Sequence, residues 1–226
     1  MPVFLALCAA APALAAERSY SVTDFDRVQV DGPYEVRLVT GRSSSAKASG
    51  SQQALDRVSV EVQGRTLRVR ENRAAWGNSR EAAGSPVTVE LSTRLVRGAT
   101  VTGPGSLSVL GAQGLKVDLA LSGSGTLDVT GVAADDLTVG LLGSGRITVA
   151  GKAKQMRATV RGSGDLDAGA LATEDTLLGA ASNGTVVVAA KRTARVTASG
   201  QGKVEVIGTP SCILSGPTAA RVKCGK

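Results

Sequence analysis

The sequence predicts an all-β chain folded as a β-solenoid, a parallel β-helix-like stack with repeats of about 20 residues and Gly-x-Gly corners. Three observations favour this fold class. Gly-x-Gly steps recur at nearly constant spacing, and the short runs between them alternate apolar and polar residues. Aromatic residues make up only 2% of the chain. A thin solenoid core needs no large aromatic anchors, because stacked Val, Leu, Ile and Ala side chains fill it.

The Gly-x-Gly steps are predicted to be the corners of successive turns. They begin at residues 103, 123, 143, 162, 182 and 200, which gives spacings of 18 to 20 residues, and the fifth is the degenerate Ser182-Asn183-Gly184. Glycine at a corner allows positive φ and lets successive turns approach closely. The predicted corner glycines are Gly103, Gly105, Gly123, Gly125, Gly143, Gly145, Gly162, Gly164, Gly184, Gly200 and Gly202.

Between corners, each repeat is predicted to supply two strands of about five residues. In one repeat, Leu115, Val117 and Leu119 share an apolar face. Lys116 and Asp118 share the opposite, polar face. This period of two is that of a half-buried strand. One such turn cannot bury its own apolar face, whereas stacked turns can.

The mature chain, residues 17–226, is predicted to be a single domain with a less regular part over 17–98 and the regular repeats over 99–226. Two alternating runs flank Gln63-Gly64-Arg65 and predict a hairpin or tight corner. Residues 41–50 are rich in serine and are expected to form a loop. Trp76, the only tryptophan, is expected to cap an apolar core, with an exposed anchor for a partner as the alternative.

Residues 1–16 are predicted to be a secretory signal peptide. They are uncharged, and an apolar run ends in the small-residue segment Ala13-Leu14-Ala15-Ala16, which is typical of a cleavage site. The run is too short to span a bilayer, so no transmembrane span is expected in the mature chain. Cys8 would be removed with the signal peptide.

Two cysteines then remain, Cys212 and Cys224. Counted from the last corner, both have the parity of inward-facing residues near the open end of the solenoid. In an exported chain this arrangement favours a disulfide, and two buried free thiols are the alternative.

The residue types present exclude several kinds of chemistry. The chain has no histidine, which excludes histidine metal sites, histidine general bases and Ser-His-Asp triads. Gly123-Ser124-Gly125 and its copies are followed by strands, whereas a phosphate-binding glycine loop needs a following helix. Asp165 and Asp167 resemble a calcium-binding turn, but no neighbouring repeat repeats the pair. No catalytic residue, cofactor or metal ligand is therefore predicted.

Several motifs together resemble the GIN-domain family of putative auto-transporter adhesin heads. They are the repeated Ser-Gly-Ser-Gly corners, as at 122–125, the opening Phe25-x-x-Val28-x-Val30-x-Gly32-x-x-x-Val36 and the late Gly208-Thr209-Pro210. The resemblance covers about residues 22–226. It implies an exported bacterial protein, in the periplasm or on the cell surface, with a β-helix-like fold and no established chemistry. No catalytic or binding residues come with the family.

We therefore expect a non-catalytic cell-envelope protein that presents flat faces for adhesion or scaffolding. Its partner would be an envelope polysaccharide or another protein, and specific nucleic-acid binding is not expected. One alternative is a polysaccharide-processing β-helix enzyme, which would need clustered acids and aromatic platforms. Another is a basic module that binds anionic envelope polymers, which the net charge of +7 allows. These functions differ in whether the outward charges gather on one face.

Overall fold

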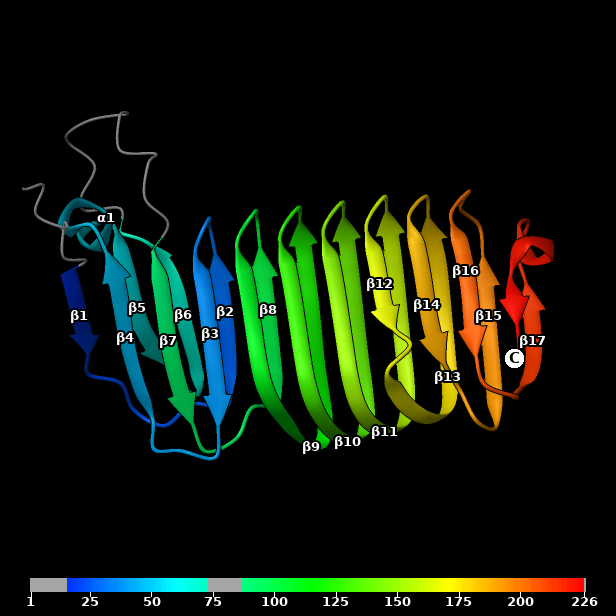
Figure 1. Ribbon diagram of the computed structural model, residues 1–226, viewed down its shortest axis with the longest axis horizontal. Helices are drawn as coiled ribbons and strands as arrows, with labels where there is room; N and C mark the ends of the chain where they lie inside the picture. Colours follow the sequence, from blue (N-terminus) through cyan, green and yellow to red (C-terminus); the bar gives the residue numbers. More distant parts are fainter. Residues whose placement is uncertain (1–15, 73–86, 226) are drawn as a thin grey trace, which may run out of the picture.

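The computed structural model describes residues 16–72 and 87–225 as one elongated β-solenoid of about six turns (Figure 1). The predicted fold class is confirmed. The signal-peptide prediction falls outside the described residues except for Ala16, which begins β1 (Ala16–Tyr20). Cys8 and Trp76 also lie outside them.

Three long strands form the regular middle of the solenoid: β9 (Ser106–Gly123), β10 (Thr126–Gly143) and β11 (Arg146–Gly162). Each bends midway and contributes to two sheets, so these repeats hold one bent strand where the sequence predicted two short ones. The reason is that residues in the bend still pair with the neighbouring turn, as Ala133 does with Gln113. The later turns hold two strands each: β12 (Asp165–Ala168) and β13 (Leu171–Ser182), β14 (Thr185–Ala189) and β15 (Thr193–Ala198), and β16 (Lys203–Ile207) and β17 (Ser211–Ser215).

Successive turns stack in parallel and in register. Leu127 pairs with Leu107 on one side and with Ile147 on the other. The corner Gly143 pairs with Gly123 and with Gly162 in the same way. Equivalent residues therefore form rows along the solenoid axis, with the strand spacing of about 4.8 Å between neighbours. In Figure 1 the corners follow the upper edge and the mid-strand bends the lower edge.

The turns build two sheets that face each other across the core. The first sheet holds β1, β4 (Ser45–Gly50), β7 (Thr88–Thr93), β3 (Glu35–Thr40), the first halves of β9–β11, and then β12, β14, β16 and β18 (Lys223–Cys224). The second sheet holds β5 (Val58–Gln63), β6 (Thr66–Glu71), β2 (Arg27–Asp31), β8 (Gly98–Thr102), the second halves of β9–β11, and then β13, β15 and β17.

Alternate residues of both sheets fill the core with aliphatic side chains. Val117, Leu119 and Leu121 are at most 2% exposed, as the period-two pattern predicts. The prediction that Leu115 shares their inward face is wrong, because this residue is 76% exposed. Leu115 lies just after Gly114, in the bend that carries the chain from one sheet to the other. The alternation that holds within a straight strand is lost there.

The N-terminal part adds short strands to both sheets and a single helical turn. The strands are β2 (Arg27–Asp31), β3 (Glu35–Thr40), β4 (Ser45–Gly50), β5 (Val58–Gln63), β6 (Thr66–Glu71), β7 (Thr88–Thr93) and β8 (Gly98–Thr102), and the helix is α1 (Gln52–Asp56). The antiparallel pair β5 and β6 confirms the predicted hairpin. The expectation of a loop over 41–50 is correct for 41–44 but wrong for 45–50, which form β4: Ala46 and Ala48 are buried, and small alternating residues suffice for a strand.

The C-terminal turn ends in a 3-10 helix, Ala219–Arg221, and the short strand β18 (Lys223–Cys224). Cys212 in β17 and Cys224 in β18 are joined by a disulfide, with their Cα atoms 6.5 Å apart. Both cysteines pack against the edge of the core. The bond therefore links the second sheet to the first at the end of the solenoid.

Both glycines of a corner are required by close packing, since a Cβ atom on Gly123 or Gly143 would also lie within 3.0 Å of backbone atoms of the preceding turn, and the first is required by its backbone conformation as well. The first has positive φ, for example +123° at Gly123 and +121° at Gly143. The second is needed for space: a Cβ atom on Gly125, Gly145 or Gly164 would lie within 3.0 Å of backbone atoms of the preceding turn. At the degenerate corner, the buried Ser182 hydroxyl donates to the Gly164 carbonyl and accepts from the Gly184 N–H. This serine thus fits the corner through its own hydrogen bonds.

Candidate functional site

An open depression of about 690 Å³ lies on the outer surface of the second sheet. We call it the second-sheet depression. Five successive turns line it, with Lys116 and Asp118, residues 136–138, residues 155–157, residues 175–177, and Arg192, Thr193 and Arg195. The solenoid produces this site because the parallel register of successive turns places outward residues that are far apart in sequence side by side.

One row of outward residues crosses the depression along the solenoid axis. Arg157 of β11 pairs in register with Leu177 of β13, which pairs in turn with Arg195 of β15. The two arginines therefore lie on either side of Leu177, with Cα atoms about 9–10 Å apart, two strand spacings. Leu177 is 38% exposed, so an apolar side chain separates two guanidinium groups at this surface.

Two of the three carboxylates that line the depression, Asp118 and Asp175, are in ion pairs. Arg27 contacts Asp118 at 3.3 Å, and Arg192 pairs with Asp175. The hydrogen bond from Arg192 holds the pKa of Asp175 below its usual value. Asp136 pairs in register with Lys116 on the neighbouring strand. Acidic groups at the depression thus have cationic neighbours of their own.

Three arginines on the outer face of the second sheet have no such partner: Arg157 and Arg195 line the depression, and Arg161 lies just outside it. Within the described part of the chain, Arg157, Arg161 and Arg195 form no ion pair and no side-chain hydrogen bond. Arg161 follows Arg157 on the outer face of β11, four residues along the strand. We call these three residues the arginine group. Its guanidinium donors face solvent and are free to bind an anion.

The charge of the solenoid changes sign along its axis. Residues 98–145 contain one lysine against four aspartates, whereas residues 146–198 contain eight Lys or Arg against four Asp or Glu. Much of the net charge of +7 thus belongs to the turns that carry the arginine group. Among these cations, the arginine group lies on the outer face of the second sheet, whereas Arg146 belongs to the first sheet.

The floor beside the arginine row is unusually bare. Gly179 lies between Thr159 and Thr197 in the next outward row, and Gly140 lies beyond Thr159. A Cβ atom on Gly140 or Gly179 would meet nothing closer than a carbonyl oxygen at 4.0 Å. These two glycines are therefore not required by close packing, unlike the corner glycines. Glycine inside a strand weakens it, and such positions often mark a close approach by another molecule.

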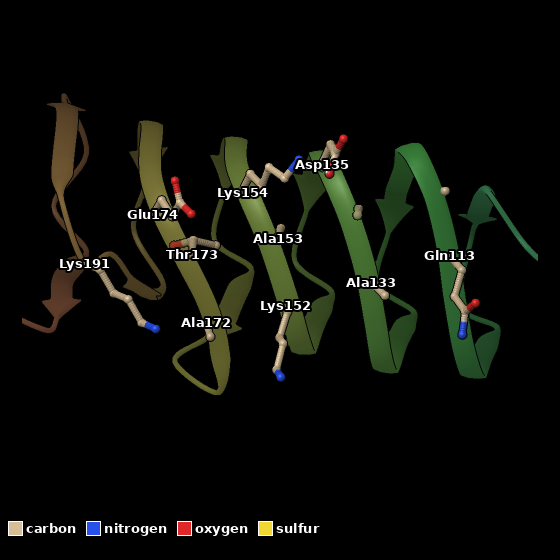
Figure 2. Close-up of a pocket in the computed structure, with 12 residues that line it drawn as sticks. Gln113, Ala133, Asp135, Lys152, Ala153, Lys154, Ala172, Thr173, Glu174 and Lys191 are labelled. Atoms are coloured by element: carbon tan, nitrogen blue, oxygen red, sulfur yellow. Dashed lines mark ion pairs between the residues drawn. The ribbon is translucent and has the colours of Figure 1, made fainter.

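A second depression, of about 650 Å³, follows the edge formed by the mid-strand bends (Figure 2). Lys154 reaches towards Asp135 there and pairs with it at 2.9 Å, which raises the pKa of Lys154. Lys152 and Lys191 point away from that pair. Neither forms an ion pair with any residue that the structure describes. This edge therefore extends the basic surface beside the arginine group.

The carboxylates singled out in the sequence have structural partners. Asp165 accepts a hydrogen bond from the Thr185 N–H and another from Arg146, and these contacts hold its pKa below the usual value. Asp167 accepts from the Gly169 N–H. Across the described residues, no group of three or more His, Cys, Asp or Glu side chains is placed to hold a metal ion. No helix in the same part of the chain is long and apolar enough to cross a membrane.

Sequence reasoning named the corner glycines and the two cysteines but missed the arginine group. The structure places the predicted corner glycines along one edge, away from the second-sheet depression, and the cysteines at the C-terminal end. Arg157 and Arg195 are 38 residues apart in sequence, close to two repeats. Aligning the repeats and comparing their outward positions would have revealed this row.

Together, the fold and the second-sheet depression define a rigid parallel β-solenoid with an open, charged surface suited to binding. The chain belongs to the family described as "Putative auto-transporter adhesin, head GIN domain", whose profile matches residues 24–210. The family resemblance predicted from the sequence is confirmed. The family description supports an adhesion-type surface protein.

Solved structures share the fold along nearly the whole chain. A putative adhesin from Bacteroides fragilis superposes with a TM-score of 0.78 at 18% identity, covering 94% of this chain and 95% of that one. A putative lipid binding protein from Parabacteroides distasonis gives 0.71 at 17% identity, covering 95% and 98%. A putative adhesin from the same species gives 0.67 at 21% identity, again covering 95% and 98%. At these identities the likeness concerns the fold. A comparison with curated proteins found no match.

Proposed function

We propose that the protein is an exported, non-catalytic binding module of the bacterial envelope, and that it attaches to its partner through the second-sheet depression. The observation that supports this most is the arginine group: its three cations form no ion pair within the described chain, and two of them, Arg157 and Arg195, line the depression. The guanidinium donors of these arginines can bind a partner without first breaking an ion pair or hydrogen bond within the protein. The membership in a family described as adhesin heads supports the same function.

Binding is favoured over polysaccharide cleavage by the state of the nearby acids. A glycosidase needs one carboxylic acid whose pKa is raised so that it can donate a proton. Here the hydrogen bond from Arg192 lowers the pKa of Asp175, and Arg27 holds Asp118. These residues are suited to supporting the surface, and not to general acid catalysis.

The proposal is tested by blocking the depression. The purified domain, labelled with a fluorophore, would be titrated with washed bacterial envelope fragments. Gly179 is the next outward residue of β13 after Leu177, which lines the depression, so Gly179→Trp places a large side chain against it. This variant should reduce the amount of domain retained on the fragments at least tenfold. The matched control, Ser108→Trp, places the same side chain on the exposed outer face of the first sheet and should bind like the wild type. Equal retention of both variants would overturn the proposal.

A further inference from the structure

Building on the proposed function, we propose that the second-sheet depression and the outer face beside it bind an extended anionic polysaccharide, and that Arg157, Arg161 and Arg195 hold its carboxylate or sulfate groups.

The first step is the chemistry of the arginine group. A guanidinium group presents several N–H donors in a planar fork that matches the two oxygens of a carboxylate or sulfate. Such charge-assisted hydrogen bonds are the strong ones, and they need donors not already used. The arginine group meets that condition, because its members form no ion pair within the described chain. The preferred ligand is therefore an oxyanion.

The second step is the spacing of the three arginines. Arg157 and Arg195 lie two strands apart, about 9–10 Å, and Arg161 lies four residues, about 13 Å, along the strand from Arg157. One small oxyanion cannot bridge such distances. A ligand that engages all three must carry several negative groups along an extended chain. A polymer of acidic sugars has this form.

The third step is the shape and composition of the surface. Between Arg157 and Arg161 on the outer face lies Thr159, and its neighbour across the strands is Gly179. A narrow chain can lie on this low floor, with the hydroxyls of Thr159 and Thr197 beside it. The residues that line the depression include no aromatic side chain. Binding of neutral sugars by stacking is thus not favoured, and charge must supply the affinity.

The direction of the ligand follows from the remaining charges. Asp136 lies one strand before the arginine group, and Asp118 lies one strand further. On the other side, β17 presents Ser211, Ile213 and Ser215, which carry no charge. An anionic chain would therefore extend from β11 towards β17 and avoid the acidic turns.

The test is a binding titration of the folded domain against immobilised polygalacturonate and dextran sulfate, with neutral dextran as the polymer control. The variant Arg157→Gln/Arg195→Gln should bind either acidic polymer about tenfold to hundredfold more weakly, because two charge-assisted contacts are lost. The matched control, Arg42→Gln/Lys47→Gln, removes two exposed cations far from the depression and should stay within about twofold of the wild type. Binding should also weaken steeply as salt is raised.

Three results would overturn the inference. One is an equal loss of binding to the acidic polymers in both double variants, which would mean that net charge alone attracts the polymers. A second is equal binding to neutral dextran. A third is binding to phosphatidylglycerol vesicles without binding to either acidic polymer, which would identify a lipid surface as the ligand.

The test also separates this inference from the proposed function. If Gly179→Trp abolishes envelope binding but the arginine variant does not, the depression is the binding surface and its ligand is not anionic. If neither change affects envelope binding, the proposed function itself is wrong.

Discussion

Gly125 lies directly against Gly105 of the preceding turn, so close that a Cβ atom on Gly125 would come within 3.0 Å of the Gly105 carbonyl oxygen. The same relation repeats between Gly145 and Gly125 and between Gly164 and Gly145. The backbone of one turn therefore lies directly on the backbone of the preceding turn at this edge. Successive turns can approach this closely because glycine has no side chain. The corners keep the two sheets in register along the axis.

This relation predicts opposite results for two glycine substitutions. Gly125→Ala forces the corner apart and should destabilise the fold by about 1–3 kcal/mol or more, as overpacking does. Gly179→Ala meets open space and should be neutral or stabilising by up to about 1 kcal/mol, because the unfolded chain loses freedom. Chemical denaturation followed by circular dichroism measures both. Equal effects of the two changes would contradict the proposed role of close stacking.

The degenerate corner gives a second prediction. The buried Ser182 hydroxyl satisfies both the Gly164 carbonyl and the Gly184 N–H. Ser182→Ala should therefore cost about 1–3 kcal/mol of unfolding free energy, because the Gly164 carbonyl loses its donor and the half-buried Gly184 N–H loses its acceptor. The exposed corner residue Ser144 is the control, and Ser144→Ala should change stability by less than about 0.5 kcal/mol. A neutral Ser182→Ala variant would mean that glycine-like size alone matters at this position.

The third prediction concerns the disulfide between Cys212 and Cys224, which closes a loop with a sequence separation of 12. A bond of this span stabilises a chain by about 2–3 kcal/mol. The terminal turn has a stacking neighbour on one side only, so reduction should release it first. Amide hydrogen exchange should quicken over residues 211–225 while the corner glycines stay protected. Loss of protection throughout β10 on reduction would contradict this expectation.

The fourth prediction is a pH dependence of stability. The Thr185 N–H and Arg146 hold the pKa of Asp165 below its ordinary value, so folding favours the ionised carboxylate. This contribution is complete above the unfolded-state pKa of about 4 and is lost as pH falls through the lower folded-state pKa. Asp165→Asn should therefore be less stable than the wild type at pH 7, with the gap narrowing towards pH 2. A gap that widens on acidification would show the opposite sign of linkage.

Much of the fold followed from residues that repeat. The period of the Gly-x-Gly corners and the alternation of apolar residues such as Val117 and Leu119 specified a parallel stack, because both patterns are local and each turn copies the last. The sequence-based assignment of strands and inward faces was wrong at positions outside the regular part of the repeats. Leu115 stands in a bend, and β4 is a strand built on two alanines in a serine-rich segment. Neither case has a strong local signal.

The sequence by itself determined the solenoid, its corners and the inward parity of Cys212 and Cys224, since these depend on spacing along the chain. Only the tertiary structure decided which side chains share a surface. Arg157, Leu177 and Arg195 come together because three turns stack in register. The two arginines stay without ion pairs because the nearby Asp118 and Asp175 are paired with Arg27 and Arg192. A binding surface of a solenoid runs across its strands, so the residues that form it are distant in sequence. The stacking of the turns decides which side chains are neighbours on that surface.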